Sequence, residues 1–189
     1  MARIESTMVP LGTRAPQFEL VDCLTDQLIS FSTIAGEKGT VVMFICNHCP
    51  FVLHTIAGIV SLAKEYRSKG IGFIAINSND IEQYPADSPD NMKNFASSEG
   101  FTFPYVFDET QEVAHSYSAA CTPDFFVFDH HHHLVYRGQL DDSRPGNDLP
   151  VNGHSLKSAL ECIIRNEEIT LDQKPSIGCN IKWKPEIAH

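Results

Sequence analysis

Two continuous apolar runs separated by one amphipathic stretch constrain the fold of this chain most strongly. TVVMFI (40–45) and IGFIAIN (71–77) are rich in β-branched residues, which is typical of strands covered on both faces. Between them, CPFVLHTIAGIVSLAKEYRSKG repeats apolar residues at helical spacing, and Gly70 stands where a helix would end. Two such strands joined by a helix form a βαβ unit, so we expect them to be parallel.

A polar segment after the second strand predicts an insertion that is mainly helical. Ser88 and Pro89 suit the N-cap and the first position of a helix over 89–99. FPYVFD then predicts a short strand, and Asp108 can cap a further helix near 109–119.

The last third of the chain predicts a hairpin and a final helix. DFFVFD (124–129) and HLVYRGQ (133–139) are apolar strands with a tight connection, which favours antiparallel pairing. A helix is expected near 154–166, and 167–189 lacks a regular pattern. The element order predicts an α/β fold, with a central mixed β-sheet flanked by helices, in a single domain over 1–189.

Composition and charge exclude several classes of partner. The net charge is -10 and no cluster of Lys and Arg is visible, so we expect no nucleic-acid partner. No stretch approaches the ~18–20 apolar residues of a membrane span, and the N-terminus lacks the apolar run of a signal peptide. We therefore expect a cytoplasmic protein that binds no membrane, with a homodimer as one alternative for its assembly. The acidic loops 78–90 and 141–148 are expected to be solvated.

CNHCP (46–50) is the stretch with the clearest chemical meaning. It places two cysteines at the end of a predicted strand and the start of a predicted helix. A helix N-terminus stabilises a thiolate, so we expect a lowered pKa at Cys46, while Cys49 is close enough to attack a mixed disulfide. A protonated His48 would stabilise the Cys46 thiolate further. The couple should therefore be more oxidising than thioredoxin, whose potential is about −270 mV.

Two other interpretations of these residues stay open. Cys46 and Cys49 could be inert buried thiols, or they could bind copper or zinc together with His48 and another histidine, although structural zinc usually takes two ligand pairs. The run His130–His133 also suggests a metal. Adjacent residues point in different directions, so a solvated hairpin tip is the preferred interpretation of that run.

Several motifs together resemble a known family. The order strand, CxxCP, helix, strand, and then CTPDFFVFD is similar to the thioredoxin fold. APQFEL near the N-terminus and the inserted helical segment resemble the peroxiredoxin-like (AhpC/TSA, redoxin) branch. CNHCPFV, AINSND, YRGQLDDSRPGN and GCNIKWK resemble a group of cytosolic thioredoxin-family proteins that carry a CxxC. The resemblance covers nearly the whole chain and implies a thioredoxin-like fold with an N-terminal extension.

The resemblance also implies roles for individual residues. Cys46 would be the attacking thiol and Cys49 the resolving thiol, Pro123 would follow a cis peptide bond, and the backbone of Thr122 would dock an extended substrate. The implied activity is thiol–disulfide exchange in cell redox homeostasis, on protein or small-molecule disulfides. No cofactor is implied, and a thioredoxin-type or glutathione system would supply electrons.

The chain departs from its family's patterns at three places. Ile45 replaces the tryptophan that precedes the first cysteine in thioredoxins, and the strand 40–45 lacks their buried carboxylate. The peroxiredoxin signature PxxxTxxC also fails, because its threonine place holds Cys46 or Met43, depending on which cysteine is counted from. An AhpC/TSA-type thiol peroxidase is therefore the alternative function, and Arg137 is the candidate cation for a peroxide.

Two further cysteines are candidate accessory thiols. Cys121 directly precedes the Thr-Pro pair, so it is expected near the active site or as a small residue that fills a tight bend. Cys179 could swing in to resolve a mixed disulfide. The preferred alternative for Cys179 is an ordered arm packed through Ile177, Ile181 and Trp183.

Overall fold

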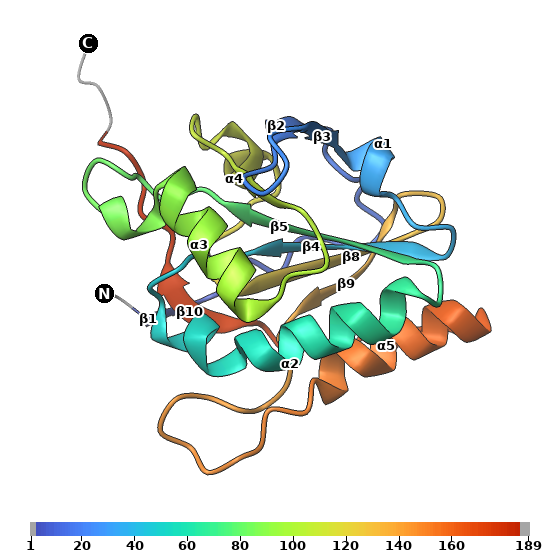
Figure 1. Cartoon of the computed structure of the whole chain (residues 1–189). Helices are drawn as coiled ribbons and strands as arrows, with labels where there is room; N and C mark the ends of the chain where they lie inside the picture. Colours follow the sequence, from blue (N-terminus) through green and yellow to red (C-terminus); the bar gives the residue numbers. More distant parts are fainter. Residues whose placement is uncertain (1–2, 186–189) are drawn as a thin grey trace.

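A computed structural model describes residues 3–185 of the chain (Figure 1). Its centre is a five-stranded sheet in the order β6-β5-β4-β8-β9. The β4–β5 and β5–β6 pairs are parallel, whereas β4–β8 and β8–β9 are antiparallel. The sheet is therefore mixed, as predicted. The strands are β4 Gly39–Phe44, β5 Ile71–Asn77, β6 Tyr105–Phe107, β8 Asp124–Asp129 and β9 Leu134–Gly138.

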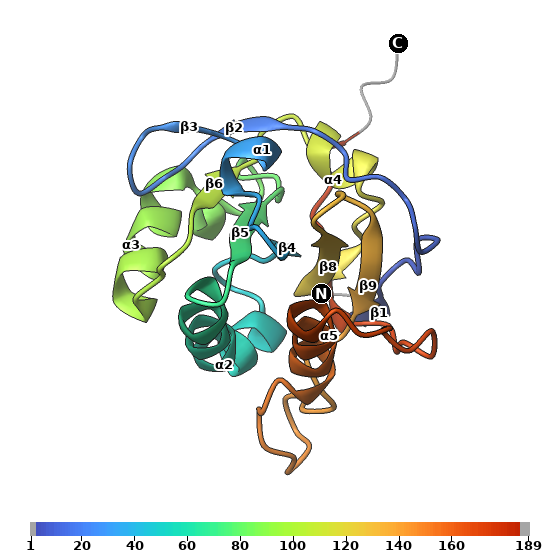
Figure 2. The ribbon, with the colours of Figure 1, turned by 90° about the vertical axis from the view of Figure 1, so that its right-hand side faces the viewer.

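Helices cover both faces of this sheet (Figures 1 and 2). One face carries the three long helices α2, α3 and α5, and the other carries the short helices α1 and α4 with the N-terminal segment. This arrangement confirms the predicted sheet flanked by helices. The helices are α1 Phe31–Ile34, α2 Pro50–Arg67, α3 Pro89–Glu99, α4 Glu112–Ser116 and α5 His154–Arg165, and a 3-10 turn, η1, covers Pro85–Asp87.

The central strand β4 shows why its sequence is continuously apolar. Side chains alternate across a strand, so Val41 and Met43 join the core under α2 while Val42 and Phe44 join the core under α1 and α4. All four side chains are buried. A strand between two helical layers has no solvent-facing side chains, and the apolar run follows from that position.

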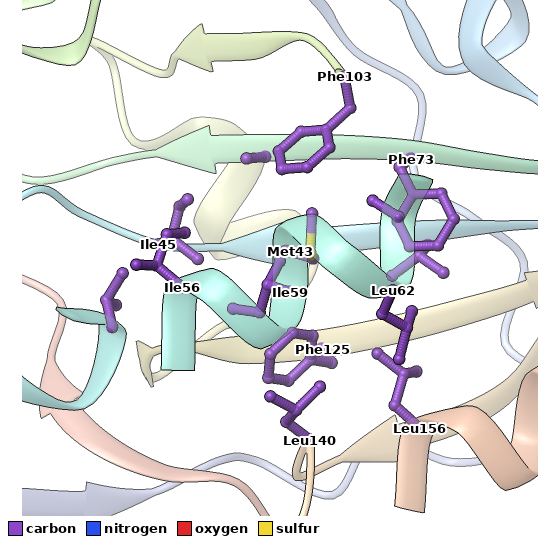
Figure 3. Close-up of a cluster of buried hydrophobic side chains, with 14 of the residues drawn as sticks. Met43, Ile45, Ile56, Ile59, Leu62, Phe73, Phe103, Phe125, Leu140 and Leu156 are labelled. Carbon is purple, nitrogen blue, oxygen red and sulfur yellow. The ribbon is translucent and has the colours of Figure 1, made fainter. Parts of the chain in front are cut away.

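The larger core lies between the sheet and α2 (Figure 3). Met43 and Phe125 are register partners on β4 and β8, and Ile59 of α2 packs over them. Leu156 brings α5 into the same cluster. This packing holds the start of α2 against the end of β4, which is where CNHCP lies.

The C-terminal segment differs from its prediction. Instead of being irregular throughout, it contains a strand, β10 Ile177–Asn180, in the middle of a second sheet ordered β1-β10-β7. Sequence patterning missed β10 because it is four residues long with a glycine. The other strands of this sheet are β1 Arg3–Glu5 and β7 Cys121–Thr122, and a separate pair is formed by β2 Glu19–Val21 and β3 Leu28–Ser30.

One predicted helix is shorter than expected. The region 109–119 contains only α4, whose N-cap residue Gln111 has a positive φ of 65°. Asp108 still satisfies this helix end, because its carboxylate accepts the backbone N–H of Ala114 at 2.9 Å. The expected helix over 89–99, the hairpin and the final helix are confirmed.

The extent of the domain is a separate question from the fold. Among the described residues, no helix combines the length and the apolar character that crossing a membrane requires. The prediction of a single domain over 1–189 stays a prediction, and residues 1–2 and 186–189 lie outside the described part of the chain.

Candidate active site

The two cysteines of CNHCP lie where β4 passes into α2. The backbone N–H of Ile45 still bonds to the carbonyl of Ile76 on the neighbouring strand, and the chain then leaves the sheet. Cys49 is the N-cap residue of α2, and Pro50 is its first helical residue. Both thiols are free, with Cys46 1 % and Cys49 0 % exposed. The dithiol is thus positioned by a buried strand and by the end of a long helix.

The Thr122–Pro123 loop lies directly against both thiols. The peptide bond between these two residues is cis. The Sγ of Cys46 is 3.4 Å from the Thr122 hydroxyl, and the Cys49 thiol donates to the Thr122 carbonyl at 3.1 Å. The structure therefore brings together two segments that are more than 70 residues apart, as the family resemblance implies.

The backbone edge that was expected to dock substrate is already in use. Thr122 belongs to β7, and its register partner on β10 is Cys179. Because β7 ends the sheet β1-β10-β7, β10 occupies one of its edges.

The pKa values of the two thiols move in opposite directions. Both thiols contact Thr122, and the neighbouring Cys46 thiol lowers the pKa of Cys49 to about 5. The neighbouring Cys49, together with burial and the nearby charge of Asp87, raises the pKa of Cys46. The direction at Cys46 is opposite to the predicted lowering, which falls on Cys49 instead. The helix begins at Pro50, so Cys49 stands at its N-cap, and Cys46 is one turn farther from that end.

His48 has a charged neighbour that the sequence did not reveal. Its Nδ1 is 2.8 Å from Oδ2 of Asp87, a fully buried carboxylate. The approach lies off the direction of the ring N–H bond, so the contact is an ion pair rather than an aligned hydrogen bond. Contact with Asp87 raises the pKa of His48, which favours the imidazolium form. The ring stacks on Tyr84 with 5.6 Å between centroids and 4° between planes.

Asp87 is held rigidly by groups from the ends of two neighbouring strands. Its Oδ1 accepts the backbone N–H of Asn47 at 2.8 Å, and its Oδ2 accepts the side-chain amide of Asn79 at 2.8 Å. One signal could have found this residue. The loops after β4 and β5 leave the same edge of a parallel pair, so the segment after Asn77 had to pass close to CNHCP.

The prediction that both acidic loops are solvated was wrong at three carboxylates. Asp80, Asp87 and Asp141 are each at most 2 % exposed. Asp141 accepts the backbone N–H groups of Asn152 and Gly153, at 2.8 and 2.6 Å. Each of these carboxylates accepts a backbone N–H group, from the same loop or from another segment, and composition alone does not show that.

Two buried groups flank the cis peptide bond. The Cys121 thiol donates to the carbonyl of Pro123 at 3.6 Å, and burial raises its pKa. Asp124 is fully buried, and burial raises its pKa to about 8. Its Oδ2 accepts the Ala120 N–H, while Oδ1 has no hydrogen-bond partner among the described residues. Asp124 is the nearest equivalent to the buried carboxyl that the strand 40–45 lacks.

Arg137 and the histidine run take no part in the dithiol site. The Arg137 guanidinium bonds to the Val9 carbonyl and to Gln173, at 2.7 Å each, so the structure does not support its role as a cation for peroxide. His130–His133 forms the connection between β8 and β9, and Asp129 accepts the N–H groups of His131 and His133 at 2.9 and 2.8 Å.

One group of metal-ligand atoms is present at the site. Ligand atoms of Cys46, His48 and Asp87 lie within 4.8 Å of one another. These residues offer a thiol, an imidazole and a carboxylate, which are the ligand types that zinc takes. Asp87 thus joins two of the residues that the sequence had offered for a metal.

Comparison with known proteins identifies the family of this chain. Residues 10–153 match the model of the Redoxin family. The chain belongs to the Redoxin family. This assignment confirms the family resemblance that the motifs carried, and it gives this redoxin a redox function.

Solved structures agree with the assignment. This redoxin is 53 % identical to an uncharacterized conserved protein from Geobacillus kaustophilus, with a TM-score of 0.97 and 98 % of each chain covered. A thiol:disulfide interchange protein of the thioredoxin family from Chlorobium tepidum TLS is 19 % identical, with a TM-score of 0.62, over 81 % of this chain and 97 % of that one. The second similarity confirms the thioredoxin-like fold.

One curated relative is named for its activity. It is the thiol-disulfide oxidoreductase ResA of Halalkalibacterium halodurans, which is 25 % identical over 131 residues, or 69 % of each chain.

Proposed function

We propose that this redoxin is a thiol–disulfide oxidoreductase that cycles between a Cys46–Cys49 dithiol and the corresponding disulfide. The observation that carries the proposal is that two free thiols both contact Thr122, at 3.4 and 3.1 Å, beside the cis Thr122–Pro123 bond. The activity named for the ResA relative is consistent with this. A thiol whose pKa is lowered is a better nucleophile at neutral pH, which supports a redox role for the pair over an inert one.

The first chemical step joins Cys46 to the substrate. Cys46 Sγ attacks one sulfur of the substrate disulfide and passes its proton to the neighbouring Cys49. The leaving sulfur takes the electron pair, and His48, which Asp87 keeps protonated, is placed to give it a proton. Cys46 is only 1 % exposed, so substrate entry requires that part of the cover formed by the half-buried His48 move aside.

The second step closes the disulfide. Cys49 loses its proton and attacks Cys46 Sγ, the mixed disulfide breaks, and the second substrate sulfur leaves with the electron pair. Cys49 stands beside Cys46 at the N-cap of α2, so its sulfur is next to the mixed disulfide that it attacks. The substrate disulfide has then become two thiols, and the protein has gained one disulfide.

The test is reduction of a model protein disulfide, such as insulin, with a chemical reductant as electron source. Cys46→Ser should abolish turnover, and Cys49→Ser should leave a trapped mixed disulfide on Cys46. Cys162→Ser is the matched control, because Cys162 lies on α5 away from the dithiol and should leave turnover unchanged. Equal turnover in the Cys46→Ser variant would overturn the proposal.

The physiological partners belong to the same proposal. We propose that reduced thioredoxin or glutathione regenerates the dithiol, that the protein works in the cytoplasm, and that it is a homodimer. Coupled assays with each donor, cell fractionation and sedimentation test these three points separately. Each point can fail without affecting the assignment of the dithiol.

Peroxide reduction is a second candidate function that one contact favours. The chain lacks the threonine of the PxxxTxxC motif. The Thr122 hydroxyl, from another part of the chain, lies 3.4 Å from Cys46 Sγ and could take its place. The predicted cation, Arg137, bonds elsewhere, to the Val9 carbonyl and to Gln173. A stopped-flow peroxide assay separates the two functions. Rapid oxidation that is lost in Thr122→Val, with no insulin reduction, would favour the peroxidase.

Metal binding is a third candidate, and the Cys46, His48 and Asp87 ligand atoms favour it. Copper or zinc delivery would need the reduced dithiol, because a thiolate is the ligand. Metal analysis of protein purified without an affinity tag is decisive here. Stoichiometric metal that is lost in both Cys46→Ser and Asp87→Asn would support a metal carrier.

A further inference from the structure

A third thiol lies in the same cluster as the dithiol. Cys179 is 4 % exposed and pairs in register with Thr122, whose carbonyl accepts the Cys49 thiol at 3.1 Å. It belongs to the same buried cluster as Cys46 and Cys49. Cys49 thus has one thiol neighbour from its own loop and another from the C-terminal strand.

The strand that carries Cys179 is fixed, not a swinging arm. A Cβ on the preceding Gly178 would lie 2.1 Å from the Thr122 carbonyl oxygen, so β10 approaches the cis-proline loop as closely as a glycine allows. Beyond the strand, the Lys182 N–H bonds to Asn79, and its carbonyl accepts the N–H of Asp80, both at 2.8 Å. Cys179 therefore reaches Cys49 without rearrangement of the chain.

We propose that Cys179 is a third redox thiol, which exchanges with the Cys46–Cys49 disulfide to form Cys49–Cys179 and to free Cys46. This inference rests on the proposed function of the dithiol. In the exchange, the Cys179 thiolate attacks Cys49 Sγ, and the Cys46–Cys49 bond breaks as the new S–S bond forms. The electron pair leaves on Cys46, which takes up the proton that Cys179 lost. No external oxidant or reductant is consumed.

The charges at the site favour attack of Cys179 on Cys49 only after the dithiol is oxidised. In the reduced protein, burial and the neighbouring Cys49 raise the pKa of Cys179 to about 12, so Cys179 stays protonated and inert. Once Cys49 is in a disulfide it carries no charge, and the part of the shift due to Cys49 disappears. Burial, the larger cause, persists, but Cys179 is then easier to deprotonate than in the reduced protein, and its target sulfur is in a disulfide.

The exchange would give the protein two oxidised forms with different properties. In one form the disulfide joins Cys46 and Cys49. In the other, the disulfide ties the N-cap of α2 to β10, and Cys46 is a free thiol again. The second form keeps the protein oxidised while Cys46 can still join a substrate.

Disulfide mapping of the full chain tests the inference. Trypsin leaves Cys46 and Cys49 on the peptide 39–64 and Cys179 on 166–182, because the Lys174–Pro175 bond is not cut. Cys46→Ser removes one partner, so oxidised glutathione should convert most of this variant to a cross-link between the two peptides. The cross-link should be absent in Cys46→Ser/Cys179→Ser. It should persist in Cys46→Ser/Cys121→Ser, which controls for the other buried thiol of the loop.

The outcomes separate this inference from the proposed function. The same mapping of oxidised wild-type protein should show both the bond within peptide 39–64 and the cross-link to 166–182. A wild-type chain that forms only the bond within 39–64, with no cross-link in Cys46→Ser, overturns the role of Cys179 and leaves the proposed function intact. A wild-type chain that forms no bond within 39–64 overturns the proposed function.

Discussion

The Nδ1 atom of His48 lies 2.8 Å from a carboxylate oxygen of Asp87, and both groups lie within 4.8 Å of the Cys46 sulfur. The histidine comes from the CxxC itself, and the aspartate comes from the turn η1 in the inserted segment. A buried carboxylate beside an imidazole keeps that imidazole charged, and a charged imidazole stabilises a neighbouring thiolate. The inserted segment therefore takes part in the electrostatics of the dithiol.

Replacement of Asp87 should change the titration of His48. In Asp87→Asn the ion pair is lost, and the His48 midpoint in an NMR titration should fall, since a close opposite charge favours the protonated imidazole. Asp90→Asn, an exposed carboxylate at the start of α3, is the control and should leave the midpoint unchanged. An unchanged midpoint in Asp87→Asn would show that the two groups do not interact in solution.

The dithiol should lose its first proton well below the usual pH of a thiol. Thiolate absorbance of the reduced protein should rise by one thiolate as the pH passes about 5, because the neighbouring Cys46 thiol stabilises the Cys49 thiolate. In Cys46→Ala that thiol is gone, so the midpoint should move up toward the value of an ordinary thiol. Cys162→Ala should titrate like the wild type. A midpoint that stays low in Cys46→Ala would assign the stabilisation to another group.

The redox potential should depend on the charge of His48. A protonated His48 stabilises the thiolate and hence the reduced form, so the Cys46–Cys49 couple should be above the thioredoxin value of about −270 mV. His48→Phe keeps an aromatic ring to stack on Tyr84 but removes the charge, and the potential should fall by roughly 30 mV, which corresponds to a tenfold change in the equilibrium constant. Equilibration with glutathione measures both values. His54→Phe, on the adjoining helix, is the control.

Asp124 should make the protein less stable as the pH rises. Burial raises its pKa in the folded protein to about 8, while an unfolded chain has about 3.9. Between these values the folded state binds more protons than the unfolded state. The contribution of Asp124 to the free energy of unfolding therefore falls by up to about 1.4 kcal/mol for each unit that the pH rises. Asp124→Asn removes this pH dependence. The variant should be more stable than the wild type at alkaline pH, and the difference in free energy of unfolding should shrink as the pH falls.

The measurement for Asp124 is denaturant unfolding at several pH values. Asp90→Asn, which removes an exposed charge, should keep the wild-type slope. If the free energy of unfolding changed with pH in the same way in the wild type and in Asp124→Asn, a protonated carboxyl at this position would be contradicted.

The core under α2 should account for much of the stability. Phe125→Ala removes a fully buried ring that packs between Met43 and Leu140, and we expect a loss of about 3–5 kcal/mol in the free energy of unfolding (Figure 3). Leu53→Ala, on the exposed side of the same helix layer, should cost less than about 0.5 kcal/mol. Equal losses in the two variants would mean that this cluster is not a closely packed core.

Local sequence patterns were enough to predict most of the fold and the centre of the site. The apolar runs 40–45 and 71–77 have to be covered strands, since so many adjacent apolar side chains cannot face water, and the stretch between them has one apolar face. The boundary between the first strand and its helix then places Cys46 and Cys49 at the edge of the sheet. The Thr122–Pro123 pair followed from the family resemblance.

Only the tertiary structure decided which other groups surround the dithiol. Asp87 and Cys179 come from a loop and a short strand whose sequences look polar or irregular, and their burial depends on backbone contacts made across the fold. The direction of the pKa shift at each cysteine also depended on where α2 begins and on the other thiol beside it. Periodicity in a sequence records which faces are covered. Distances between polar atoms arise only when the chain is packed, which is why the charges of this site could not be predicted.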